Sequence, residues 1–69
     1  MTSKYDQLDG AILARIASGV TTYYEICRRV EHLSKPHAIR YWDRVVDRRL
    51  QCLRKHGLIR YVDKHWTLV

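Results

Sequence analysis

Hydrophobic residues in the first part of the chain recur at the spacing of a helix. Leu8, Ile12 and Ile16 are each four residues apart, so their side chains share one helical face. We expect a helix from about Asp6 to Ser18, capped at its start by Ser3 or by its own first residue.

The segment from residue 20 to about residue 31 predicts a short strand and a second helix. Val20 and Thr21 are β-branched and favour a strand. Thr22 and Glu25 have the spacing of a capping box, in which each side chain bonds a backbone N–H of the first turn. We expect this helix to end near Glu31, with a buried stripe formed by Ile26, Cys27 and Val30.

The third helix is predicted to be one long element, from about Pro36 to His56. Proline is tolerated in the first turn of a helix. The apolar positions that follow step by three and four without interruption, at Ile39, Trp42, Val46, Leu50 and Leu53. At 1.5 Å per residue this helix would be roughly 30 Å long.

The remaining residues predict a β-hairpin. The expected strands are Ile59 to Val62 and His65 to Val69, joined at Asp63 and Lys64. We expect three of their side chains to cover the core, namely Tyr61, Trp66 and Leu68. The predicted fold is therefore mainly α with a small β-hairpin, in a single domain of residues 1–69.

Cationic side chains dominate the outer side of the predicted third helix. Thirteen Lys and Arg residues against seven Asp and Glu residues give the chain a net charge of +6, which favours polyanionic partners. Five polar residues lie within an arc of about 80° opposite the apolar stripe, namely Arg40, Arg44, Arg48, Gln51 and Lys55. The alternative is an ordinary solvated face, on which Asp43 and Asp47 pair with neighbouring arginines.

The chain resembles winged helix-turn-helix proteins of the MarR and ArsR type. Their pattern V-x-R-x-L-x-x-L-x-x-x-G-L-I is matched at Val46, Arg48, Leu50, Leu53, Gly57, Leu58 and Ile59. Residues 8–13 are similar to the family's first helix, and residues 20–26 to its first strand and the start of its second helix. One segment, residues 35–45, is longer than in the family, and either lengthens the third helix or forms a loop.

The resemblance implies a three-helix winged helix-turn-helix that places its third helix in the major groove of DNA. We expect contacts to base edges from Arg40, Arg44 and Gln51 and contacts to phosphates from Arg48 and Lys55. The wing would add Arg60 and Lys64. The start of the second helix would add Thr22 and Tyr23, which can hydrogen-bond a backbone phosphate.

A further side of the third helix is apolar and belongs neither to the stripe nor to the cationic side. It carries Tyr41, Val45 and Cys52. Because a chain of this length buries little apolar surface by itself, we expect this side to form a homodimer interface. The alternative is that the N-terminal helix folds over it.

Several kinds of function lack the residues they need. The chain has no glycine-rich phosphate loop and no G-x-S-x-G motif, so we expect no catalysis, no cofactor and no small-molecule substrate. Cys52 and His56 are four residues apart, but no Cys or His pair has zinc-binding spacing, and we expect no metal. Without a long apolar stretch or a signal peptide, the protein is expected in the cytoplasm, away from membranes.

The leading prediction is sequence-specific binding of double-stranded DNA by a small, repressor-like transcriptional regulator. The alternative is a winged-helix module that binds another protein and not DNA. Binding of structured RNA by the same basic surface is a third hypothesis.

Overall fold

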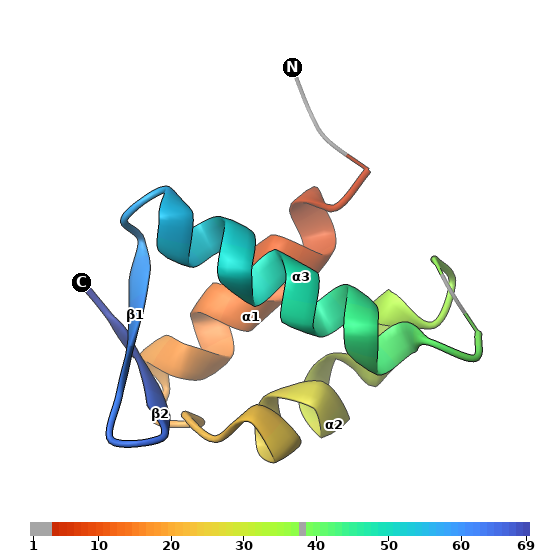
Figure 1. Ribbon diagram of the computed structural model, residues 1–69. Helices are drawn as coiled ribbons and strands as arrows, with labels where there is room; N and C mark the ends of the chain where they lie inside the picture. Colours follow the sequence, from red (N-terminus) through yellow and green to blue (C-terminus); the bar gives the residue numbers. More distant parts are fainter. Residues whose placement is uncertain (1–3, 38) are drawn as a thin grey trace.

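The computed structural model describes residues 4–37 and 39–69. Three helices precede a two-stranded antiparallel hairpin, in the order α1 (Asp6–Ala17), α2 (Tyr23–Ser34), α3 (Trp42–Lys55), β1 (Ile59–Val62) and β2 (His65–Leu68). Figure 1 shows α3 lying across α1, with α2 beside it and the hairpin next to the C-terminal end of α3. The predicted mainly helical fold with a small hairpin is confirmed. Within the described residues, no helix is long and apolar enough to cross a membrane.

One hydrophobic core joins all five elements. The predicted stripes of α1 and α2 are buried, as are the last three apolar positions predicted for α3. Complete burial of each leucine or isoleucine side chain contributes roughly 1.5–3 kcal/mol. The buried apolar residues are Leu8, Ile12, Ile16, Ile26, Cys27, Val30, Val46, Leu50, Leu53, Ile59 and Trp66.

The prediction of one helix from Pro36 to His56 is wrong at its N-terminal end. Residues 35–37 and 39–41 form turns and bends, and Ile39 is 82% exposed. The reason lies in α2, which continues to Ser34 instead of ending near Glu31. The buried Ser34 hydroxyl donates to the Glu31 carbonyl over 3.3 Å, so the chain reverses later than predicted and α3 begins at Trp42.

Neither α1 nor α2 has a side-chain hydrogen bond at the N-cap that the structure assigns to it. Thr22 occupies the N-cap position of α2 in an extended conformation, but its side chain makes no cap hydrogen bond, so the predicted capping box is not formed. At the start of α1 the N-cap is Tyr5, not Asp6, again without a side-chain cap bond. Ser3, the other predicted cap, lies outside the described residues.

The connection between α1 and α2 contains no strand, contrary to the prediction for Val20 and Thr21. One hydrogen bond nevertheless joins it to the hairpin, because the Trp66 N–H donates to the Thr21 carbonyl over 2.8 Å. The Thr21 hydroxyl oxygen also lies 2.9 Å from Nδ1 of His65. The start of α2 is therefore held against β2.

The hairpin turns where the sequence predicts. Asp63 and Lys64 have φ values of 51° and 66°, as a two-residue turn of type I′ requires. Tyr61 pairs with Trp66 across the strands, and Trp66 is buried, but Tyr61 remains 51% exposed. Leu68 is 44% exposed. The prediction that all three cover the core therefore holds only for Trp66.

Candidate nucleic-acid interface

The outer surface of α3 carries three exposed cations, Arg44, Arg48 and Lys55. At 100° per residue they lie within about 40° of one another and opposite the buried Leu50. We call these three residues the cationic face. In the described part of the chain the ion pairs are Glu31 with Lys35 and Asp9 with Arg49, so no carboxylate neutralises the cationic face.

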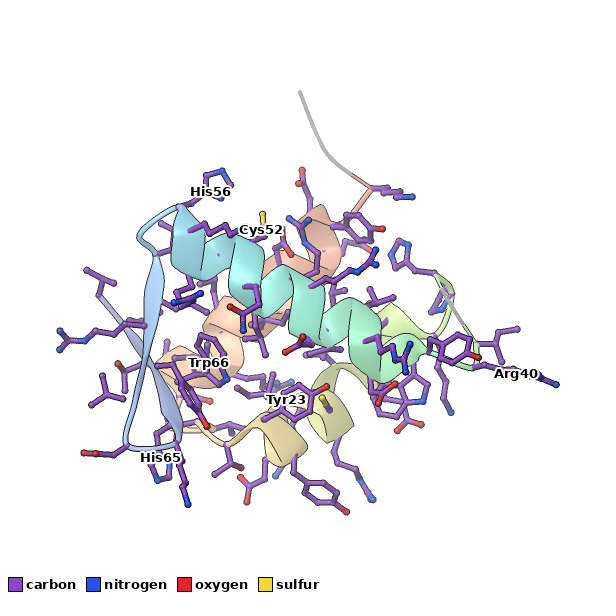
Figure 2. The ribbon with its side chains drawn as sticks, in the orientation of Figure 1. Tyr23, Arg40, Cys52, His56, His65 and Trp66 are labelled. Carbon is purple, nitrogen blue, oxygen red and sulfur yellow. The ribbon has the colours of Figure 1, made fainter. Side chains whose placement is uncertain are left out.

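Two further predicted contact residues of the third helix are not part of the cationic face. Arg40 precedes α3 and lies at the end of the molecule opposite the hairpin (Figure 2), so its predicted place on the helix is wrong. Gln51 is on α3 but partly buried, and its side-chain oxygen accepts a hydrogen bond from Nε of Arg54 over 3.1 Å. Gln51 therefore borders the hairpin side of α3.

Of the two predicted phosphate contacts at the start of α2, Tyr23 is engaged within the protein. The Tyr23 hydroxyl donates to the Asp43 carbonyl over 2.9 Å and joins the first turns of α2 and α3. Burial raises the pKa of the Tyr23 phenol, and the nearby carboxylates of Asp43 and Asp47 act in the same direction. Thr22 is partly buried, with no hydrogen bond from its side chain to the helix start.

The hairpin presents two exposed cations. Arg60 lies on the strand face opposite the one that carries Ile59 and Trp66, because side chains alternate along β1 and pair across to β2. Lys64 is at the tip. Sequence reasoning missed His65, whose contact with Thr21 ties the hairpin to the segment before α2.

A groove lies between α3, the hairpin and the first turn of α2. Figure 2 shows Tyr23 and Trp66 on the same side of α3. The groove is lined by Tyr23, Asp47, Gln51, Arg54, Tyr61 and Trp66. Sequence reasoning overlooked Asp47 and Arg54 as possible ligand contacts, although their positions seven residues apart place them on the same side of a helix as Gln51.

The residues of the predicted dimer interface do not share one continuous helical side. Tyr41 precedes α3, and Val45 is partly buried against the core. Cys52 is partly buried, with its sulfur 3.6 Å from Nδ1 of His56. Tyr5, the residue that precedes α1, borders the same surface as Val45.

The cysteines and histidines do not gather into a metal-binding arrangement within residues 4–37 and 39–69. No group of three or more His, Cys, Asp or Glu side chains there has the proximity to hold a metal ion. Burial raises the pKa of the Cys27 thiol, which keeps it in its unreactive protonated form.

The chain was compared with protein-family models, with curated proteins and with solved structures, and none matches.

Proposed function

We propose that the protein binds double-stranded DNA as a winged helix-turn-helix transcriptional regulator that acts as a repressor. The observation that carries this proposal is the cationic face, where three solvent-exposed cations on one helix have no carboxylate partner among residues 4–37 and 39–69. Phosphates attract such unpaired cations, and an α-helix fits the major groove.

The roles of individual residues follow from their positions. Arg44 lies near the N-terminal end of α3 and is proposed to contact a base edge, whereas Arg48 and Lys55 contact phosphates. Gln51 contacts DNA from the border of the groove. The hairpin residues Arg60 and Lys64 reach the flanking backbone, since both are exposed.

Salt dependence provides the first test. If the three cations of the cationic face each neutralise one phosphate, the logarithm of affinity falls with that of salt concentration with a slope of about −2.7. This slope corresponds to about a 40-fold loss of affinity between 50 and 200 mM salt. We expect fluorescence anisotropy with labelled duplex DNA to show this dependence.

Substitutions separate the proposed roles. Arg48→Ala should reduce the salt slope by about one and weaken all duplexes alike. Arg44→Ala should cost about 1–3 kcal/mol on a selected binding site and relax its specificity. Arg15→Ala is the matched control, because Arg15 is an exposed arginine in the last turn of α1. If both variants on α3 bind like this control, α3 does not contact the DNA.

Two protomers would present two cationic faces to neighbouring half-sites and multiply affinity. We propose a homodimer that uses the surface around Tyr41, which is 57% exposed. Sedimentation of the wild type and of Tyr41→Glu tests this, because Tyr41 contributes no core packing that the change would disrupt. We expect a dimeric wild type and a monomeric variant. A monomeric wild type at micromolar concentration contradicts the proposal.

A protein-docking module is the second candidate function, and one observation favours it. Five of the large apolar side chains that remain exposed belong to the hairpin and the residues beside it, namely Leu58, Tyr61, Val62, Leu68 and Val69. Exposed apolar clusters are typical of protein interaction surfaces. The same anisotropy titration separates the two functions, since a docking module shows almost no duplex binding at low salt.

A further inference from the structure

The groove between α3 and the hairpin combines opposite charges with an aromatic wall. Asp47 and Arg54 both line it from α3, yet neither has an ion-pair partner in the described part of the chain. Nε of Arg54 donates to Gln51, which leaves the two terminal nitrogens of the guanidinium for a ligand. The carboxylate of Asp47, two helical turns before Arg54 on the same wall of the groove, supplies two acceptor oxygens.

The aromatic wall is built as a platform. The ring of Tyr61 packs on the ring of Trp66, with 4.8 Å between their centres and 48° between their planes. Trp66 is buried and Tyr61 is 51% exposed, so the buried ring holds the exposed one in place. Aromatic side chains of this kind stack with nucleobases.

We propose that this groove binds one unpaired guanine base of a nucleic-acid strand. The two oxygens of Asp47 accept from N1–H and from the exocyclic amino group of guanine. The terminal nitrogens of Arg54 donate to O6 and N7, the acceptor pair that guanidinium groups recognise. The base stacks on Tyr61. The ligand chemistry thus uses the carboxylate, the guanidinium and the ring that the groove brings together.

Other bases match this arrangement less well. Guanine alone places two neighbouring N–H donors on one edge and two neighbouring acceptors on another. Cytosine and adenine each offer one amino group to Asp47, and thymine offers one ring N–H. The negative charge of Asp47 also repels the phosphates of the strand. A strand whose base cannot hydrogen-bond to Asp47 therefore loses affinity through this repulsion without a compensating hydrogen bond.

The inference rests on one part of the proposed function, namely that the ligand is a nucleic acid. Duplex binding uses the cationic face, whereas the unpaired base uses the groove, so the two are measured on different ligands. Weak duplex binding together with a guanine preference in single strands contradicts the proposed function alone. Strong duplex binding without that preference contradicts the guanine site alone.

The test uses four labelled five-nucleotide DNA strands, each of thymines with guanine, adenine, cytosine or thymine at the centre. Fluorescence anisotropy should show the guanine strand binding at least about tenfold tighter than the others. Asp47→Asn should remove this ratio while raising affinity for the other strands. Tyr61→Leu should weaken the guanine strand, and Tyr61→Phe should retain binding because the ring is kept.

Asp63→Asn is the matched control, since Asp63 is an exposed aspartate at the hairpin tip and asparagine also tolerates its positive φ. This variant should keep the guanine ratio. Circular dichroism melting of each variant establishes that it is folded. Equal affinity for the four strands, no binding to any strand, or a guanine ratio that survives Asp47→Asn would each overturn the proposal.

Discussion

The ion pair between Asp9 and Arg49 should contribute measurably to stability, unlike most surface pairs. Nε and one terminal nitrogen of Arg49 donate to the two oxygens of Asp9 over 2.8 and 2.7 Å. The two side chains are only 17% and 20% exposed. Exposed pairs contribute about 0.2–1 kcal/mol, and breaking a fully buried pair costs about 3–5 kcal/mol. We therefore expect a coupling energy of about 1–2 kcal/mol.

A double-mutant cycle measures this coupling. Urea unfolding of the wild type, Asp9→Asn, Arg49→Gln and the double variant isolates the energy of the pair. Each kcal/mol lost should lower Tm by about 4–8 °C in a domain of this size. The exposed pair of Glu31 and Lys35, with side chains 34% and 50% exposed, is the comparison and should couple by about 0.3–0.5 kcal/mol. Equal coupling in both pairs would refute the argument from burial.

Three further changes test the packing. Leu50→Ala should cost roughly 2–5 kcal/mol because the side chain is fully buried, and a native Tm would contradict its place in the core. Lys64→Gly should stabilise the hairpin by about 0.5–1 kcal/mol, since glycine adopts the positive φ of Lys64 without strain; a lower Tm would contradict this. Tyr23→Phe removes the hydrogen bond to Asp43 and should cost about 0.5–1.5 kcal/mol. Because the pKa of Tyr23 is raised in the folded state, the contribution of Tyr23 to stability should be constant below the ordinary phenol pKa of about 10 and be lost above it. In Tyr23→Phe this alkaline loss should shrink, as urea unfolding at several pH values would show.

The elements that the sequence predicts well are those whose local and tertiary preferences agree. In α1 the spacing of Leu8, Ile12 and Ile16 is enough to predict the helix and its buried face, because this one apolar stripe packs against the single core. The hairpin turn is predictable for a similar reason, since Asp63 and Lys64 separate two strands by two residues. Periodicity alone failed at Ile39, which continues the apolar spacing of α3 but lies in the connection before it.

That failure has a physical cause. A helical wheel predicts a helix for as long as the apolar spacing continues. The chain must nevertheless reverse its direction between α2 and α3, because both helices pack against one core. The position of the reversal depends on where α2 ends, and α2 continues to Ser34, which is buried. The groove was missed for the same reason, because Tyr61 and Arg54 meet only when the hairpin folds against α3.

The cationic face is shorter than predicted because α3 begins later, and the carboxylates of α3 lie on a separate flank of the helix. With Arg40 removed from the helix, the cationic face extends from Arg44 to Lys55, roughly 16 Å along the axis. Asp43 and Asp47 lie on the flank of α3 that borders α2 and the groove, not among the three cations. A phosphate backbone that approaches the outer surface therefore meets positive charge alone, and one displaced toward the hairpin meets the carboxylate of Asp47. For the proposed complex with DNA, this separation favours a single angle of approach, and it leaves the groove to a ligand that supplies hydrogen-bond donors.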